Sequence, residues 1–492
     1  MNSLETLDLT HSFFQLGADF FQSKHPDPVS DPYLVDFNPD AASLIGLAPS
    51  ESQRKEFAEY FSGNRLLPGC QPLAMVYSGH QFGVYNPGLG DGRGLLLGEV
   101  AGESGKTWDI HLKGCGPTRF ARGFDGRATL RSSIREYLGA EALHGLGIPT
   151  TRSLALIGIR DLVYRERPEL GGILVRLSET HIRFGSFQHF HFTNCPEKVA
   201  QLADYTIRRY FPELESEADK YRLFFRAVVE KTARLIALWQ SVGFIHGVMN
   251  TDNMAINGVT FDYGPFGFMD RFNPGFTPNS SDGNGRYAFG QQPKVAHWNL
   301  FKLGETLCNL AEPDILLKEL ESFPRIYDGF SREMMGRKLG LNIFDSEFNE
   351  LVGRLFKLLY DNQTDYTLFF RSLSNFPVSD VMRCGFKNLK DLDDWLCSYR
   401  RLIEREDLGF AERKKSMDRV NPRFILRNYL LQRAIEKALK ESDYSEVERL
   451  RILLRDPYDD HPEIFDRHGI DSEFYAAETP DSAVEMQLSC SA

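Results

Sequence analysis

The sequence predicts an α+β fold in which a smaller, strand-rich lobe precedes a larger, helical lobe. Two short apolar runs, 94–100 and 107–113, are separated by Glu-Ser-Gly-Lys, a pattern typical of a β-hairpin. From residue 196 onwards, apolar residues recur mainly with helical spacing. A chain of 492 residues is also too long for one compact core, so about two to four domains or lobes are expected.

Changes in pattern along the chain divide it into four segments. Residues 1–75 mix short helical patterns with proline-rich turns and are expected to form an N-terminal extension packed on the strand-rich lobe. Residues 76–180 are expected to form that lobe and residues 181–440 the helical lobe. Residues 441–492 are polar and acidic and are expected to form a C-terminal tail.

Several elements within these lobes have clear boundaries. Helical spacing over 129–146 ends at two glycines and predicts a helix. Apolar runs at 157–164 and 173–177 predict further strands. The widest apolar face belongs to a helix predicted at about 218–242, which leads directly into the loop at His246.

The bulk properties exclude several functional classes. With 42% hydrophobic and 25% charged residues, the composition is that of a folded globular protein. A net charge of −11 argues against a nucleic-acid partner. Seven cysteines without a C-x-x-C pair favour a reducing compartment, and we expect the cytoplasm. No signal peptide and no run of about 18 apolar residues is recognised, so no membrane partner is expected.

The loop that begins at His246 carries the most specific motif. Protein kinases have H-x-D-x-x-x-x-N in their catalytic loop, and this chain keeps His246 and Asn253 at the right spacing but has Val248 at the aspartate position. Nine residues after Asn253 comes Asp262, in a D-Y-G sequence close to the D-F-G metal motif. Together with the order of the lobes, this predicts a protein-kinase-like bilobal fold.

Two oxygen-bearing side chains of these loops are candidate metal ligands. A hard divalent cation binds through oxygen atoms, and the Asn253 amide and the Asp262 carboxylate supply them. Two unrelated loop residues are the alternative. Asp252 is the nearest carboxylate that could replace the missing base, whereas His246 is expected to have a structural role.

A glycine-rich loop over 86–94 precedes the hairpin. Glycine at every second position lets backbone N–H groups approach phosphate oxygens, and Arg93 adds further donors. The spacing fits neither a dinucleotide fold nor a P-loop. A flexible turn is the alternative.

The charged residues after this loop follow the order of a kinase. Lys113 ends a predicted strand and Glu136 lies on the next helix, as do the phosphate-binding lysine of kinases and its glutamate partner. A solvated lysine, and a capping box formed by Ser133 and Glu136, are the alternatives. Arg176 and Arg183 would suit a triphosphate, with a structural ion pair as the alternative.

With these residues in place, the chain resembles the selenoprotein O family along essentially its whole length. Six segments look like motifs of that family: Tyr77–Gly83, Leu112–Gly114, Arg131–Glu136, His246–Asn253, Asp262–Pro265 and Asn421–Phe424.

The resemblance implies a protein-kinase-like fold and transfer of AMP from ATP to Ser, Thr or Tyr hydroxyls of proteins, with UMP transfer from UTP in the presence of manganese as a further option. It also implies that ATP lies inverted, with its α-phosphorus facing the acceptor. The implied residues are Gly90, Gly92, Arg93, Asp125 and Gly126 at the nucleotide, Lys113, Arg176 and Arg183 at its phosphates, Asn253 and Asp262 at Mg²⁺ or Mn²⁺, and Asp252 as the base.

The end of the chain, Leu488–Ala492, resembles the C-S-S terminus of the family, with Ala492 in place of the last serine. Some relatives have a cysteine after the D-Y-G motif that could pair with this tail. Here the segment Asn273–Asn279 has none, so a redox latch is poorly supported and Cys490 is interpreted as an exposed thiol.

Two other functional classes compete with adenylyl transfer. A conventional protein kinase with a degraded loop would lose roughly 10²–10⁴-fold in rate with its base, which impairs phosphotransfer without abolishing it. A non-catalytic nucleotide-binding scaffold is the other alternative. Retention of Lys113, Glu136, Asn253 and Asp262 argues against the scaffold, which needs none of them.

Overall fold

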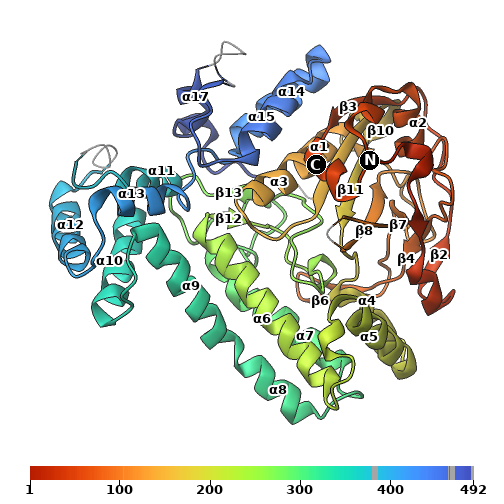
Figure 1. Cartoon of the computed structure of the whole chain (residues 1–492), viewed down its shortest axis with the longest axis horizontal. Coiled ribbons are helices and arrows are strands. Elements are labelled where there is room, and N and C mark those ends of the chain that lie inside the picture. The colour runs from red at the N-terminus through yellow and green to blue at the C-terminus, as the bar shows by residue number, and fades with distance from the viewer. Residues whose placement is uncertain (104, 379–385, 464, 466–470, 489–492) are drawn as a thin grey trace.

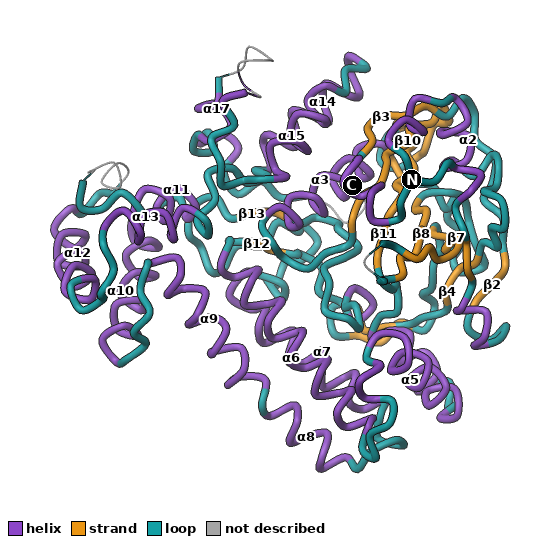
Figure 2. The backbone as a smooth tube through the Cα atoms, in the orientation of Figure 1, coloured by secondary structure: helices purple, strands orange, loops and turns teal. Residues whose placement is uncertain are grey.

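A computed structural model describes residues 1–103, 105–378, 386–463, 465 and 471–488. The fold is a mixed α+β fold in which strands gather in one part of the molecule and long helices in the other (Figures 1 and 2). Within the described residues, no helix combines the length and the apolar character that crossing a membrane requires.

A nine-stranded sheet holds the strand-rich part together. Its strands run in the order β2-β4-β7-β8-β11-β10-β3, while β1 pairs with β7 and β9 with β11, and all these pairs are antiparallel. The strands are β1 Leu9–Thr10, β2 Phe21–Ser23, β3 Tyr33–Phe37, β4 Leu73–Met75, β7 Gly94–Ala101, β8 Thr107–Lys113, β9 Ala128–Thr129, β10 Arg152–Tyr164 and β11 Pro168–Ser178. Shorter pairs are β5 Gly79–Gln81 with β6 Val84–Asn86, and β12 Phe244–Ile245 with β13 Gly267–Phe268.

The predicted hairpin is confirmed as β7 and β8, whose register places Gly94 opposite Lys113. Side chains of a strand alternate between the two faces of a sheet. Ile110 and Leu112 of β8 lie in the apolar core formed with the N-terminal segment, so Lys113 lies on the opposite face. The end of the glycine-rich loop and the lysine therefore meet at one corner of the sheet.

Helix α3, Leu130–Gly145, packs on that opposite face. It begins where Thr129 accepts a hydrogen bond from the backbone N–H of Ser132, a regular N-cap. Glu136 therefore lies inside the helix, which excludes the capping-box alternative. On its far side α3 packs against α15, Ser445–Arg455, whose Arg451 pairs with Asp36 of β3 at 2.6 Å.

The helical part surrounds a second apolar core. Helix α6, Lys220–Ser241, confirms the predicted helix and packs along α9, Phe323–Leu339. The other helices are α1 Pro39–Leu44, α2 Lys55–Ser62, α4 Phe184–Phe192, α5 Pro196–Tyr210, α7 Gln292–Thr306, α8 Pro313–Glu321, α10 Ser346–Asn362, α11 Tyr366–Leu373, α12 Leu389–Ile403, α13 Phe410–Asp418, α14 Asn428–Glu441 and α17 Ser472–Ala476.

Segments near both ends of the chain pack against its middle. Strands β1 to β4 come from residues 1–75, for which the pattern predicts an extension, and they pair within the main sheet. Near the other end, Leu488 donates to Pro278 at 2.7 Å and accepts from the Ser280 backbone at 2.9 Å. Cys490 and Ala492 lie outside the described residues.

Candidate active site

Three cations and two carboxylates form one buried ion-pair cluster. Lys113 donates to Glu136 at 2.5 Å and to Asp262 at 3.0 Å. Arg176 donates to the same two carboxylates, at 3.0 Å to Glu136 and at 2.6 Å to Asp262. Arg183 donates to Asp262 at 2.7 Å. The structure thus brings together five residues that the sequence predicts to share one site.

The register of the sheet explains why these cations converge. Arg176 of β11 lies opposite His111 of β8, and His111 and Lys113 share a face because they are two residues apart. Leu112 and Val175 lie in the apolar core on the other face. Helix α3 covers the polar face and presents Glu136 to both cations.

Asp262 has a left-handed backbone conformation and a strongly lowered pKa. Its φ is +57°, in the left-handed region, where a residue other than glycine costs of order 1–3 kcal/mol. Burial raises the pKa of a carboxyl group, but the charges of Lys113, Arg183 and Arg176 outweigh burial and hold the pKa of Asp262 well below its usual range. The carboxylate is therefore ionised and fixed among cations.

The loop at His246 is held by its own hydrogen bonds. His246 Nδ1 accepts from the Val248 backbone N–H at 3.3 Å, so Nε2 carries the proton and donates to the Phe261 carbonyl at 3.1 Å. This confirms a structural role for His246, and it ties the loop to the residue before Asp262. Asn253 donates to the Val248 carbonyl at 2.9 Å, which leaves its side-chain oxygen to face a ligand.

Asp252 is a buried carboxylate with a free oxygen. Its side chain accepts one hydrogen bond from Gln81, at 3.3 Å to Oδ2, while Oδ1 has no hydrogen-bond partner in the described structure. Burial raises the pKa of Asp252 to about 6, and the charge of Arg183 acts against that rise. An oxygen of this kind is suited to accept a proton.

The short hairpin β5–β6 holds Asp252 in place, a role that local sequence patterns do not predict. A Cβ on Gly79 would lie 2.8 Å from Asp252 Oδ1, so only glycine fits there. His80 donates its backbone N–H to Thr251 at 2.7 Å, and Gln81 reaches Asp252. The available signal is the family-like segment Tyr77–Gly83, which contains this hairpin strand.

A second contact missed by sequence reasoning joins three distant segments. Asn250 accepts hydrogen bonds from the Tyr287 hydroxyl at 2.6 Å and from the Phe82 backbone at 3.2 Å. Tyr287 in turn accepts from the Phe82 backbone at 2.9 Å. Nothing in the local sequence of Tyr287 indicates this role.

His111 is a third missed residue, and it orients Arg176. Because arginine has no acceptor, His111 Nδ1 accepts from Arg176 Nη2 at 3.1 Å. The proton then lies on Nε2, which is 3.5 Å from Asp91 Oδ2. Burial, followed by the charge of Arg176, lowers the pKa of His111, in keeping with a neutral ring. Asp91 lies between Gly90 and Gly92, so this chain of contacts links Arg176 to the glycine-rich loop.

The glycine-rich loop packs tightly on the segment after β8. A Cβ on Gly90 would lie 2.5 Å from the Phe120 ring, and one on Gly92 would lie 2.8 Å from the Phe120 carbonyl. These glycines therefore have a packing reason that is independent of a phosphate. Arg93 is exposed and forms no ion pair within the described residues, but its charge interacts with those of Glu136 and Asp262 in the cluster.

Asp125 and Gly126 lie on the far side of this loop, where the structure shows no contact with the cluster. Arg165 binds Asp125 with two hydrogen bonds of 2.8 and 2.9 Å. These bonds, with a smaller contribution from Arg93, lower the pKa of Asp125. Gly126 has φ +64° and no room for a Cβ, which would lie 2.1 Å from the Pro117 nitrogen.

The donor set fits a hard divalent cation in type. Asp262 would supply a carboxylate and Asn253 an amide oxygen. Among the described residues, no three His, Cys, Asp or Glu side chains gather as a metal site of their own. This suits Mg²⁺, which takes most of its ligands from phosphates and water.

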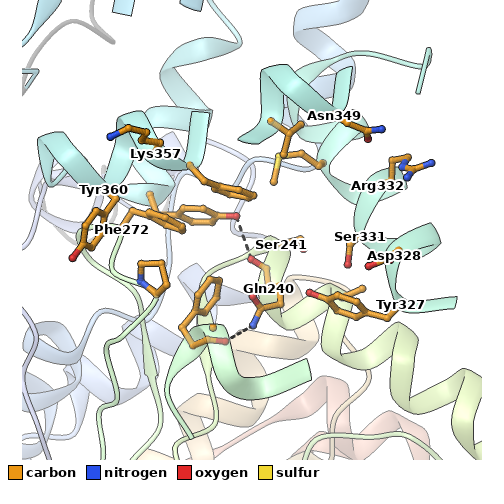
Figure 3. Close-up of a pocket in the computed structure, with 18 of the residues that line it drawn as sticks. Gln240, Ser241, Phe272, Tyr327, Asp328, Ser331, Arg332, Asn349, Lys357 and Tyr360 are labelled. Carbon is orange, nitrogen blue, oxygen red and sulfur yellow. Dashed lines mark hydrogen bonds between the residues drawn. The ribbon is translucent and has the colours of Figure 1, made fainter. Parts of the chain in front are cut away.

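An apolar cavity of about 620 Å³ lies elsewhere, between α6, α9 and α10. Figure 3 shows Tyr327, Ser331 and Arg332 of α9 along one wall, with Lys357 and Tyr360 of α10 across the hollow. The residues that line it include no member of the ion-pair cluster. A large apolar pocket is the usual first candidate for an active site, but the charged residues that the sequence predicts to share a site lie in the polar cluster instead.

Comparison with known proteins gives a uniform result. A family model described as "Protein adenylyltransferase SelO" matches residues 3–455. Three similar proteins, each named "Protein nucleotidyltransferase YdiU", come from Myxococcus xanthus (strain DK1622), Thioalkalivibrio sulfidiphilus (strain HL-EbGR7) and Thiobacillus denitrificans (strain ATCC 25259 / T1). They are 48%, 47% and 46% identical to this chain, and each match covers 100% of both sequences.

Proposed function

The chain belongs to the protein adenylyltransferase SelO family of protein nucleotidyltransferases, and on that premise we propose that it transfers AMP from ATP to Ser, Thr or Tyr hydroxyls of other proteins. The proposal extends to the fold, which we describe as protein-kinase-like and bilobal. The sheet with α3 corresponds to the first lobe, and the helices from α4 onwards form the second. The boundaries at residues 75, 180 and 440 stay predictions.

The ion-pair cluster supports the binding of a triphosphate. Lys113, Arg176 and Arg183 converge on Asp262, while Glu136 pairs with Lys113 and Arg176, and Asp91 lies 3.8 Å from Arg183. Buried guanidinium groups are well suited to phosphate because their donors form a rigid fork. We assign the phosphates of ATP to these three cations. Arg93, Gly90, Gly92, Asp125 and Gly126 are assigned to the rest of the nucleotide.

Asp252 is assigned as the base that accepts the proton of the attacking hydroxyl. The hydroxyl oxygen forms a bond to the α-phosphorus, the bond from that phosphorus to the bridging oxygen breaks, and pyrophosphate leaves. Mg²⁺ or Mn²⁺, held by Asn253 and Asp262, would supply charge neutralisation at the phosphates. Lys113, Arg176 and Arg183 then stabilise the charge that develops on the leaving pyrophosphate, and positioning supplies much of the remaining rate.

One observation carries this proposal. The position that holds the base in kinases is Val248, while Asp252, next to the proposed metal donor Asn253, is a buried carboxylate with an unpartnered oxygen in the described structure. A conventional kinase has no use for a second buried carboxylate there, because its base occupies the first position. A non-catalytic nucleotide-binding scaffold would not need the β5–β6 hairpin to hold Asp252 in place.

The test uses ATP labelled separately at its α- and γ-phosphates, with the full chain and a mixture of soluble proteins as acceptors. Transfer of the α-label to protein, with release of labelled pyrophosphate from γ-labelled ATP, is expected. Transfer of the γ-label would identify a kinase and overturn the proposal. Nucleotide binding without transfer of either label would identify a scaffold.

A further inference from the structure

A second cavity, of about 490 Å³, is more polar than the first, and more basic than acidic side chains line it. It lies where the chain segments that follow α3 and α6 meet α9. Four basic side chains line it: Arg234, Arg337, Lys338 and Arg419. Glu333 is the one acidic residue among the described residues of the lining. With Lys338 protonated the lining carries a net charge of +3, opposite in sign to the net charge of −11 of the whole chain.

None of these four cations has a carboxylate within 4.0 Å in the part of the chain that the structure describes. By contrast, Arg371 and Lys414 in the neighbouring helices both pair with Asp418. Arg234, Arg337 and Arg419 are exposed at the cavity, whereas Lys338 is only 3% exposed. The cations of this cavity are therefore not neutralised by the protein around them.

Lys338 is the most unusual of the four. Its ammonium group lies 4.3 Å from the centre of the Phe370 ring and 5.5 Å from that of Tyr366, so it contacts aromatic faces in place of a carboxylate. Burial lowers the pKa of Lys338 to about 7. A buried cation without an anionic partner costs stability, and an external anion would remove that cost.

The fold alone accounts for part of this charge. Arg337 and Lys338 lie in the last turn of α9, where the helix dipole favours cations. The same argument covers Arg419, the C-cap residue of α13, but not Arg234, which lies in the interior of α6. Convergence of cations from three separate segments needs a different explanation.

We infer that this cavity binds a polyphosphate group, either free or carried by a nucleotide. Arginine binds phosphate oxygens through parallel N–H donors, and the three exposed arginines at this cavity match about three negative charges. The volume falls in the range of sites for small organic ligands. Leu146, Leu238 and Val242 add apolar surface for the uncharged part of a ligand.

The cavity adjoins the backbone that carries the candidate active site. Pro149 at its wall accepts a hydrogen bond from the Thr260 backbone at 2.9 Å, two residues before Asp262. Val242, also at the wall, lies four residues before His246. An anion in this cavity is therefore placed to influence the nucleotide site through short chain segments.

The experiment separates the cavity from the nucleotide site. The full chain with Lys113→Met is titrated with inorganic pyrophosphate, ATP and adenosine by calorimetry at 150 mM salt. Binding of pyrophosphate or ATP, but not adenosine, is expected to persist in this background. Adding Arg337→Glu and Arg419→Glu should weaken it at least about tenfold, because two attractive charges become repulsive. Tighter binding of ATP than of pyrophosphate assigns the polyphosphate to a nucleotide, and equal binding assigns it to a free anion.

A matched control lies on the same helix. Arg332 of α9 is exposed but lines the apolar cavity, so Arg332→Glu should leave polyphosphate binding unchanged. Absence of polyphosphate binding in the Lys113→Met chain, or equal loss with Arg332→Glu, would overturn the inference. Neither result bears on adenylyl transfer, which the α-label assay measures with the unmodified chain.

Discussion

Two groups of cations in this protein differ in how their charge is balanced. In the candidate active site, Lys113, Arg176 and Arg183 each contact a carboxylate at 3.0 Å or less. In the cavity beside α9, none of the four lining cations does so within the described residues. Paired cations are fixed in direction before a substrate arrives, whereas unpaired cations depend on pH, salt and ligand for their neutralisation.

The difference matters because burial disfavours charge in both regions, and only in the first do neighbouring charges offset it. At Asp262 the neighbouring cations overcome burial and keep the carboxylate ionised. At Lys338 nothing offsets burial, and the pKa of the amine falls to about 7. The first region is built for electrostatic preorganisation, and the second is sensitive to conditions near neutral pH.

Removal of Asp262 should break the paired region most severely. Asp262→Ala removes the carboxylate that all three cations share, leaving Glu136 for Lys113 and Arg176 and Asp91, at 3.8 Å, for Arg183. It also places alanine at a left-handed φ, so the free energy of unfolding should fall by about 3–5 kcal/mol. Transfer of the α-label should fall by about 10³–10⁵-fold, the scale seen when a charge-stabilising group is lost at a phosphoryl-transfer site. Urea unfolding and the label assay measure the two effects.

Asp270→Ala is the matched control for that variant. Asp270 is also a buried carboxylate that pairs with an arginine, Arg427, at 3.2 Å, but it lies outside the cluster. It should lower stability without removing the metal dependence of nucleotide binding. Unchanged nucleotide affinity and metal response in Asp262→Ala would show that the metal assignment is wrong.

Asp252→Asn tests the base and should have the next largest effect. The amide keeps the shape of the side chain but cannot accept the hydroxyl proton, so kcat should fall by about 10²–10⁴-fold with little change in ATP affinity. Single-turnover transfer and equilibrium binding distinguish these quantities. Asp361→Asn, at an exposed carboxylate of α10, should retain full activity. Wild-type rates in Asp252→Asn would assign the proton to another group.

Lys338→Met tests the unpaired region and should raise stability. The folded pKa of about 7 lies below the ordinary lysine value of 10.5, so the folded state loses its proton first as pH rises. The cost of the buried charge is therefore complete below pH 7 and disappears towards pH 10.5. We expect a gain of about 1–4 kcal/mol at neutral pH and below, and none at high pH.

Urea unfolding from pH 6 to 10 measures this effect. The wild-type chain should gain stability relative to Lys338→Met as pH rises, because only the wild type loses the charge. Lys357→Met, at an exposed lysine of α10, should change stability by less than about 0.5 kcal/mol at every pH. A pH-independent difference between wild type and Lys338→Met would mean that the lysine remains charged throughout.

His111→Leu should have the smallest effect, and it tests how far orientation matters within the paired region. Loss of the acceptor for Arg176 removes one hydrogen bond of a charged group, worth about 1.5–3 kcal/mol, while the ion pairs remain. KM for ATP should rise about three- to tenfold, with a smaller change in kcat. His111→Asn, whose amide oxygen can accept the same hydrogen bond, should recover part of the loss. Equal effects of Leu and Asn would indicate a purely structural role.

Local patterns in the sequence predicted much of the secondary structure around the site. The hairpin, the helix carrying Glu136 and the helix before His246 all follow from periodicity and turn residues, which act over a few positions. The order of Lys113, Glu136 and Asp262 predicted their convergence because the kinase motif fixes that order. For the hairpin and the two helices, the decisive signal lies within one short segment.

Contacts between distant segments could not be predicted in this way. The contacts made by Gln81, Asn250 and Tyr287 join segments that lie up to 205 residues apart in the sequence. None of these residue types indicates such a contact from its local sequence. His111 alternates in a strand like any half-buried polar residue, and only the register with Arg176 reveals its role. The four short strands of residues 1–75 were missed because two to five residues carry too little periodicity.

The pairing of those short strands also determines how the molecule can be divided. A fragment of residues 76–440 would lack β1 and β4 beside β7, β3 beside β10, and α15 against α3. Unpaired strand edges are templates for self-association, and the apolar face of α3 would be open to water. The candidate catalytic residues therefore lie in a folded unit that includes segments from near both ends of the chain. We expect a fragment trimmed to the motif-bearing middle to aggregate.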